Sequence, residues 1–188
     1  MLIGICGKAT SGKDTIGDYL VKEHLFNKIS LADPIKRLVK DVFVLDDFQV
    51  YDRIEREKNL EKWNGWSVRK LLQIIGTELF REKIDEQIWV KSLYYRMEQL
   101  KNNSVCVSNY CICDIRFPDE VKYLKEKMGN DFVLIKVIRP GCDGNVGIKG
   151  HISESFDLNA DIVINNDGDK EKLYNNVRKI IVPIMEKK

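Results

Sequence analysis

Apolar runs that suit β-strands alternate with helical patterns from one end of the chain to the other. The strand-like runs lie at residues 2–6, 28–31, 110–114, 132–138 and 160–165. Strands that alternate with helices favour a parallel sheet with crossover helices on its faces. The pattern therefore predicts an α/β fold with a parallel sheet of about five strands flanked by helices.

Apolar residues at helical spacing fill most of the chain between these strands. The first helix follows a glycine-rich turn and carries Ile16, Leu20 and Leu25 inward. Further helices are expected at residues 34–44, 67–82, about 86–101, Pro118 to near Gly129, and 169–186. The stretch 45–62 is polar and mixed, which indicates short helices and loops. Since no repeat or linker interrupts the chain, we expect a single domain over residues 1–188 with a movable loop.

The sharpest motif is GKATSGKDT, from Gly7 to Thr15, between the first strand and the first helix. A phosphate-binding P-loop requires this strand–turn–helix context. Backbone N–H groups of residues 8–13 can ring an anion, and Gly12 lets the chain approach it closely. Lys13 would reach the β- and γ-phosphates of a nucleotide, near the positive end of the helix dipole. We therefore predict a P-loop NTPase fold that binds ATP through Gly7, Lys8, Ser11, Gly12, Lys13, Asp14 and Thr15.

Two aspartates are candidate ligands of Mg²⁺. Asp14 occupies the position where Ser or Thr usually binds the metal, and a carboxylate is also a hard oxygen ligand. Alternatively, Asp14 only favours the helix N-terminus electrostatically, and Thr15 serves the metal. Asp114 ends a hydrophobic strand, where an acid in P-loop enzymes normally orients the metal or its water. We expect Mg²⁺ at Asp14 and Asp114.

Arg116 lies two residues beyond Asp114, so it leaves the strand end near the same cleft. A guanidinium there can clamp a transferring or acceptor phosphate through two hydrogen bonds. The alternative is that Asp114 caps the following turn and Arg116 pairs with Asp119 or Glu120. Because a P-loop lies upstream, we expect Arg116 in the active site.

A polar stripe lies off the apolar face of the predicted helix 67–82. Arg69, Gln73 and Thr77 recur there every four residues. Gly76 lies mid-helix, where it costs roughly 1 kcal/mol relative to alanine, and this cost suggests that something approaches the backbone closely. The stripe is either a solvated surface or a wall that binds the base and phosphate of an acceptor, and we favour the wall.

Arg139 and Pro140 follow the strand 132–138 and open a glycine-containing loop. We expect this loop to act as a lid over about residues 139–156. Arg139 would bring positive charge onto the transferring phosphate.

Two further segments carry candidate contacts near the C-terminal end. His151 and Glu154 lie in HISES, where His151 is either a substrate contact or a structural histidine. Asn165 and Asn166 follow the last strand and could touch the adenine edge or form an ordinary turn. We assign Asn165 to the ATP site.

Composition narrows the partners and the compartment. A net charge of +2, with acids and bases interleaved, is too small to favour nucleic acid or an acidic membrane as the main partner. No apolar run approaches the roughly 20 residues that span a bilayer. The cysteines number 5 and lie mostly in strand-like stretches, which indicates free thiols and core packing in a reducing compartment. We expect a cytoplasmic protein, and the oligomeric state stays open, a homodimer included.

The chain also carries a series of longer motifs in a fixed order. They are GKATSGKDT, SLADPIKRL (30–38), SVRKLLQIIGTELFR (67–81), Trp89, CDIRFPDE and HISES. This series resembles the deoxynucleoside monophosphate kinase family of phages and large viruses, in which an aspartate after the P-loop lysine is usual. The resemblance covers nearly the whole chain and is weakest at 45–62 and 99–109. The tail ADIVINNDG resembles dephospho-coenzyme A kinase, and animal-type phosphomevalonate kinase shares the GKD loop.

The resemblance implies ATP- and Mg²⁺-dependent transfer of the γ-phosphate to a deoxynucleoside monophosphate, in the host cytoplasm if the protein is viral. Lys13, Arg116 and Arg139 would be catalytic, and a helical region of about residues 34–101 would bind the monophosphate. The expected substrate-binding residues are Asp33, Lys36, Arg69, Gln73, Thr77, Trp89, Arg116, His151 and Glu154. The alternatives are a related kinase of phosphomevalonate or dephospho-coenzyme A, a nucleotide-dependent switch with a protein partner, and a structural nucleotide-binding module.

Overall fold

The computed structural model describes residues 1–103, 109–142 and 158–186. The chain divides into two compact units. Unit 1 comprises Met1–Ser30 with Tyr94–Lys188, and unit 2 comprises Leu31–Leu93. The division falls within helix α5 (Ile88–Asn103), which begins in unit 2 and ends in unit 1.

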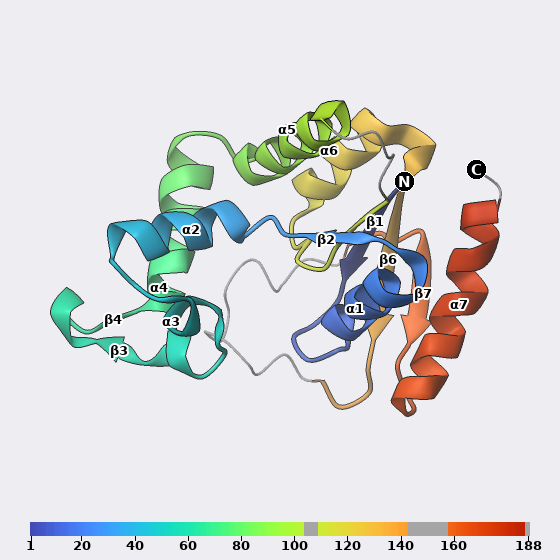
Figure 1. The fold of residues 1–188 in the computed structure, drawn as a ribbon, viewed down its shortest axis with the longest axis horizontal. Helices are drawn as coiled ribbons and strands as arrows, with labels where there is room; N and C mark the ends of the chain where they lie inside the picture. Colours follow the sequence, from blue (N-terminus) through green and yellow to red (C-terminus); the bar gives the residue numbers. More distant parts are fainter. Residues whose placement is uncertain (104–108, 143–157, 187–188) are drawn as a thin grey trace. The chain divides into compact units, whose positions relative to one another are not determined.

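Unit 1 is built on a five-stranded sheet in which every neighbouring pair is parallel. Its strands are β1 (Leu2–Cys6), β2 (Asn27–Ile29), β5 (Tyr110–Ile112), β6 (Phe132–Ile138) and β7 (Ile162–Asn165). They lie side by side in the order β2-β5-β1-β6-β7 (Figure 1). The predicted α/β fold is therefore confirmed.

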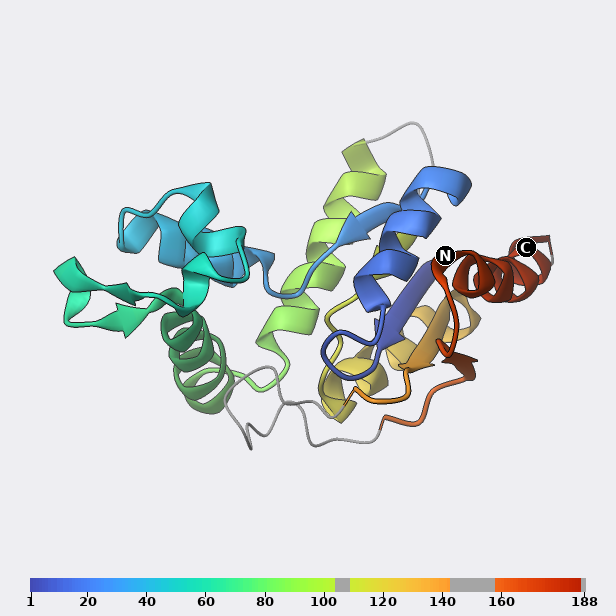
Figure 2. The same cartoon turned by 90° about the horizontal axis from the view of Figure 1, so that it is seen from below.

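Helices cover both faces of this sheet (Figure 2). The helices of unit 1 besides α5 are α1 (Lys13–His24), α6 (Pro118–Met128) and α7 (Lys170–Glu186), with a short turn η4 (Gly129–Asp131). On one face, α1 and α7 share a core with the strands, including Ile16, Leu20, Ile135 and Val177. The chain leaves β1 through α1 on that face and leaves β5 through α6 on the other face. A ligand crevice in such sheets lies at the carboxyl ends of the strands where the connections diverge, here β1 and β5.

Unit 2 is mainly helical and also contains a small antiparallel hairpin. Its elements are α2 (Asp33–Val42), α3 (Asp47–Tyr51), η1 (Glu55–Glu57), β3 (Asn59–Leu60), η2 (Glu61–Trp63), β4 (Trp66–Ser67), α4 (Val68–Gln73) and η3 (Ile74–Arg81). The hairpin β3–β4 was not predicted. Its loop spans residues 61–65, which include η2, and ends with Asn64 and Gly65, both of which have positive φ (53° and 74°).

The helix expected over 67–82 is present, but its second half is π-helical. α4 gives way at Ile74 to η3, in which hydrogen bonds join residues five apart. Because the turn of a π-helix is wider, side chains after Ile74 that are four residues apart no longer lie on the same face, as the predicted stripe assumed. Among the described residues, no helix is long and apolar enough to cross a membrane.

Candidate active site

The loop that joins β1 to α1, Gly7–Lys13, is called the phosphate loop here. Its shape depends on glycine at two positions, because Gly7 and Gly12 have φ values of 142° and 105°. A Cβ on Gly7 would lie 2.5 Å from the carbonyl oxygen of Val137, so that position also has no room for a side chain. Thr10 has a φ of 63° without being glycine, and such backbone strain concentrates at functional loops. The predicted strand–loop–helix context is present.

Lys13 folds back over this loop. Its Nζ donates hydrogen bonds to the carbonyl oxygens of Gly7 at 2.7 Å and Lys8 at 2.6 Å. Burial, and then the positive charge of Arg116, lowers the pKa of Lys13 from its ordinary value. Two cations therefore lie close enough at the loop to oppose each other's charge. Such a pair favours an anionic ligand, because an anion relieves both the desolvation and the repulsion.

Ser11, at the centre of the loop, is only 1% exposed, and its hydroxyl has no hydrogen-bond partner among the described residues. A buried hydroxyl without a partner is costly unless a ligand or water satisfies it. Ser11 and the folded-back Lys13 thus fit a loop prepared for phosphate oxygens.

The two aspartates predicted to serve Mg²⁺ both lie in unit 1, and each has a partner. Asp114 follows β5, and its Oδ2 accepts a hydrogen bond of 2.6 Å from the hydroxyl of Ser30, which follows β2. Arg96 of α5 in turn donates to the carbonyl oxygen of Ser30 at 3.1 Å. Asp14 is exposed, and its Oδ1 lies 3.2 Å from Nζ of Lys28.

The chemistry of these donors fits Mg²⁺, which typically takes one or two carboxylates together with substrate phosphates and water. The described residues contain no group of three or more His, Cys, Asp or Glu side chains arranged for a metal. Cys111 and Cys113 are buried in the core of unit 1, as their strand pattern predicted.

Lys28 also pairs with Asp18 at 2.9 Å, one helical turn beyond Asp14. Burial opposes protonation of Lys28, but the hydrogen bond with Asp18 and the charge of Asp14 outweigh burial and raise its pKa. Lys28 therefore remains a cation beside Asp14.

The two asparagines after β7 have different environments. Asn165 is exposed, whereas Asn166 is 7% exposed and its Nδ2 donates to the carbonyl oxygen of Ser11 at 2.8 Å. The asparagine that contacts the phosphate loop is thus the neighbour of the one assigned to ATP. Arg139 directly follows β6 and is exposed. His151, Glu154 and most of the expected lid 139–156 lie outside the described residues.

Unit 2 contains part of the set expected to bind the acceptor, namely Asp33, Lys36, Arg69, Gln73, Thr77 and Trp89, whereas Arg116 belongs to unit 1. Arg69 lies 3.2 Å from Glu57 of η1. Gln73 and Thr77 are half-buried. Asp33 is the first residue of α2, and Lys36 lies over the ring of Tyr51 at 5.0 Å. An acceptor phosphate at Arg69 would have to compete with the carboxylate of Glu57.

Gly76 and Trp89 both make close contacts within unit 2. The close approach at Gly76 comes from the protein itself, because a Cβ there would lie 3.0 Å from Cδ1 of Ile35. Trp89 is buried, its indole N–H donates to the carbonyl oxygen of Gly76 at 2.8 Å, and its ring packs against Phe80. Since the only hydrogen-bond donor of its side chain is used internally, Trp89 supports the helix rather than offering a hydrogen bond to a ligand.

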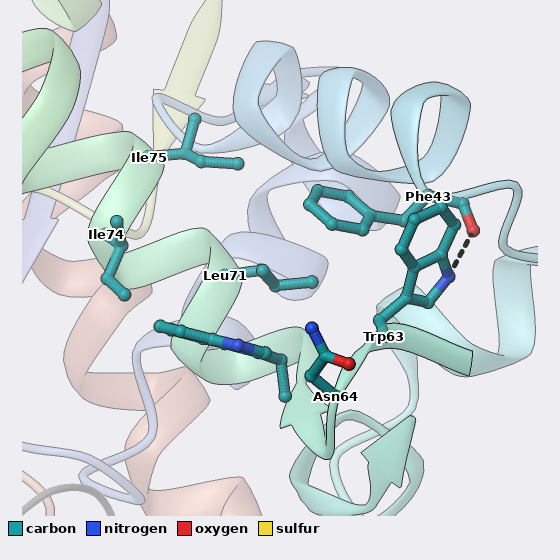
Figure 3. Close-up of a pocket in the computed structure, with 7 residues that line it drawn as sticks. Phe43, Trp63, Asn64, Leu71, Ile74 and Ile75 are labelled. Carbon is teal, nitrogen blue, oxygen red and sulfur yellow. Dashed lines mark hydrogen bonds between the residues drawn. The ribbon is translucent and has the colours of Figure 1, made fainter. Parts of the chain in front are cut away.

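Unit 2 also contains an apolar pocket of about 340 Å³ (Figure 3). Its lining residues are Phe43, Trp63, Asn64, Trp66, Leu71, Ile74 and Ile75. The indole of Trp63 donates to the carbonyl oxygen of Phe43 at 3.0 Å, which closes one side. Leu71, which lines the pocket, and Arg69, which belongs to the polar stripe, point to different sides of the helix. None of the described residues that line the pocket is charged, so it does not suit a phosphate.

Sequence comparisons point to one family. A family profile described as deoxynucleotide monophosphate kinase matches residues 42–177. A protein of Acanthamoeba polyphaga mimivirus, provisionally named a deoxynucleotide monophosphate kinase, is 33% identical to this chain. The match covers 94% of this chain and 94% of the viral protein. The deoxynucleotide monophosphate kinase of Enterobacteria phage T4 is 31% identical over 78% of this chain and 61% of its own length.

Comparison of folds gives a compatible result. A gluconokinase from Sinorhizobium meliloti 1021 superposes with a TM-score of 0.52, covering 98% of this chain and 93% of its own. The sequence identity is 11%, so this likeness concerns the fold alone.

Proposed function

Because the chain belongs to the deoxynucleotide monophosphate kinase family, we propose that it transfers the γ-phosphate of ATP to a deoxynucleoside monophosphate. The products are ADP and the deoxynucleoside diphosphate. The observation that carries this proposal, beyond family membership, is the phosphate loop, in which Lys13 is desolvated and lies near a second cation, Arg116.

The reaction places little demand on a general base. The acceptor phosphate is already an anion, so it needs positioning and charge neutralisation more than deprotonation. The ammonium group of Lys13 would give up its hydrogen bonds to the two carbonyl oxygens of the loop and donate to phosphate oxygens instead. Arg116 would neutralise charge on the transferring group. Arg139 is proposed to add positive charge at the transferring phosphate, and closure of the lid would exclude water.

Asp14 and Asp114 are the residues proposed to hold Mg²⁺. A bound Mg²⁺ ion would offset the negative charge of the phosphate oxygens. The hydroxyl of Ser30 fixes the direction of the Asp114 carboxylate, so that side chain is already oriented before a ligand arrives. Asp14 must leave Lys28, which can keep its bond to Asp18.

We assign acceptor binding to unit 2, through Arg69, Gln73, Thr77, Asp33 and Lys36. The matched family motifs and the half-buried polar face of α4 support this assignment. We also place the reaction in the cytoplasm, in line with the free thiols of Cys6, Cys111, Cys113 and Cys142.

A panel of acceptors tests the proposed function. The purified chain is supplied with Mg·ATP and, separately, with each deoxynucleoside monophosphate, its ribose counterpart, phosphomevalonate or dephospho-coenzyme A. Formation of ADP and of the phosphorylated acceptor is followed by chromatography. We expect stoichiometric ADP and deoxynucleoside diphosphate. Product from phosphomevalonate or dephospho-coenzyme A alone, or ATP hydrolysis that no acceptor accelerates, would reject the proposal.

A further inference from the structure

Asn166 is a buried polar residue in a fixed position. It directly follows β7, and its backbone N–H donates to the carbonyl oxygen of Ile138 at the end of β6, with a distance of 2.7 Å. Only 7% of the residue is exposed. The ends of two neighbouring strands therefore set where its side chain begins.

The side-chain amide of Asn166 reaches the phosphate loop. Its Nδ2 donates to the carbonyl oxygen of Ser11 at 2.8 Å, in a contact between residues 155 positions apart in the sequence. Ser11 is itself only 1% exposed, so water has little access to this carbonyl oxygen. Without Asn166 the carbonyl group would lose its partner or turn elsewhere.

The direction of the Ser11 carbonyl sets the direction of the next N–H. The peptide bonds of the described residues are not cis, and in a trans peptide the C=O and the following N–H point in opposite directions. Holding the Ser11 oxygen on Asn166 therefore turns the N–H of Gly12 away from Asn166. Gly12 is the N-cap of α1, where backbone N–H groups attract anions.

Glycine at position 12 is matched to asparagine at position 166. A Cβ on Gly12 would lie 2.6 Å from Nδ2 of Asn166, so any larger residue at position 12 would displace the amide. Gly12 also has a φ of 105°, which L-residues rarely adopt. The two residues thus fit each other closely at the point where the loop enters the helix.

We propose that Asn166 is a positioning residue of the phosphate loop, whose amide fixes the Ser11–Gly12 peptide so that the Gly12 N–H is presented to the phosphates of ATP. The proposal rests on the proposed function, since it assumes that the loop binds ATP. It assigns a role in nucleotide affinity to a side chain that is nearly inaccessible to a ligand. A purely structural asparagine would affect stability alone.

Two substitutions separate these roles. Asn166→Ala removes the donor without adding charge. Asn166→Asp keeps the shape but places a carboxylate oxygen against the carbonyl oxygen of Ser11. We expect both to raise the dissociation constant of Mg·ATP about tenfold, the size of one lost hydrogen bond to a charged system. The inhibition constant of adenosine, which has no phosphates, and the KM of the acceptor should stay within about twofold.

The aspartate variant also provides a rescue. Its protonated carboxyl group can donate to the Ser11 oxygen, so affinity for Mg·ATP should recover as the pH falls through the pKa of the new side chain. The matched control is Asn175→Asp on the exposed face of α7, which should change neither constant. If Asn166→Ala fails to fold, the pH profile of Asn166→Asp still decides the question.

A lower melting temperature with an unchanged ratio of ATP to adenosine affinity would overturn the proposal. Weaker ATP binding by Asn166→Asp that does not recover at lower pH would also contradict it. Failure of the wild-type chain to bind Mg·ATP would instead reject the proposed function, so the two failures are distinguishable.

Discussion

At the scale of single residues, the phosphate loop holds the ammonium group of Lys13 against its own carbonyl oxygens. Lys13 is half-buried, contacts two carbonyl oxygens and lies near Arg116. Carbonyl groups satisfy its hydrogen bonds but do not cancel its charge. The triphosphate of ATP can accept these hydrogen bonds and also cancel the charge of Lys13, which favours its binding over that of the carbonyl groups.

The lowered pKa of Lys13 predicts how ATP affinity depends on pH. At a pH below the pKa of Lys13 in the folded protein, the side chain is charged, and burying this charge lowers the stability of the fold. As the pH rises towards the ordinary value of 10.5, Lys13 loses its proton in the folded protein, so the cost of burial disappears together with the charge. Bound phosphates favour the ammonium and raise the pKa again. We therefore expect the KM of ATP to rise with pH before 10.5 is reached.

The measurement is the KM of ATP from about pH 7 to 10 in the wild-type chain and in Lys13→Arg, whose guanidinium stays charged throughout. The arginine variant should show a flat profile even if its activity is low. Identical profiles in the two proteins would show that another group controls ATP binding.

Arg69 offers a prediction for the acceptor. Its guanidinium lies 3.2 Å from Glu57, so the carboxylate and an acceptor phosphate would compete for it. Arg69→Ala should raise the KM of the deoxynucleoside monophosphate about tenfold with little change in kcat, as expected for uniform binding. Glu57→Gln should lower that KM or leave it unchanged.

The control for this pair is Lys62→Ala, which removes an exposed positive charge from unit 2. Acceptor kinetics in Arg69→Ala that match those of the control would mean that the helix face is only a solvated surface.

At the scale of elements, α1 packs so closely against the sheet that alanine is not expected to be favoured over glycine at one of its positions. Gly17 lies inside α1, where alanine would normally be favoured by about 1 kcal/mol. A Cβ there would lie 2.5 Å from Sγ of Cys113 and 3.3 Å from Cε of Lys28. We expect Gly17→Ala to destabilise the fold by about 1–3 kcal/mol, the cost typical of overpacking.

Urea unfolding of Gly17→Ala, Cys113→Ala and the double variant provides the test. Because removing Sγ makes room for the new methyl group, the double variant should be more stable than the sum of the single effects predicts. Stabilisation by Gly17→Ala alone would contradict this account of the packing.

Some elements could be predicted closely from the sequence, and others could not. The continuous apolar run of β6 gave its bounds, Phe132–Ile138, correctly. The hairpin β3–β4 was missed although Asn64 and Gly65 lie in its loop, because its strands are two residues long and show no alternation. The π-helical segment η3 was not visible, since α- and π-helices draw on the same residues.

The candidate site shows the same division. Lys13 and Asp114 could be selected as candidates from motifs, because each belongs to a local pattern of strand and loop. The partners Ser30, Lys28 and Asn166 come from other strands, so only the fold brings them to the site. Asn165 and Asn166 are adjacent in sequence, and which of them turns inward depends on how β7 ends.

At the scale of the whole molecule, the sequence is divided between two units with different chemistry. Unit 1 contains the phosphate loop, both proposed metal ligands and the sheet that orients them. Unit 2, Leu31–Leu93, contains Arg69, Gln73 and an apolar pocket without charge. Unit 2 runs from Leu31 to Leu93, whereas the helical region expected to bind the monophosphate was predicted over about residues 34–101.

The most direct test of phosphoryl transfer follows the phosphate itself. ATP labelled with ³²P in its γ-phosphate is incubated with the chain, Mg²⁺ and a deoxynucleoside monophosphate, and the products are separated. We predict that the label appears in the β-phosphate of the deoxynucleoside diphosphate. Lys13→Ala should slow this at least ~100-fold, whereas Lys22→Ala, an exposed lysine of the same helix, should not. Label found only in inorganic phosphate, or equal rates with Lys13→Ala, would contradict the account.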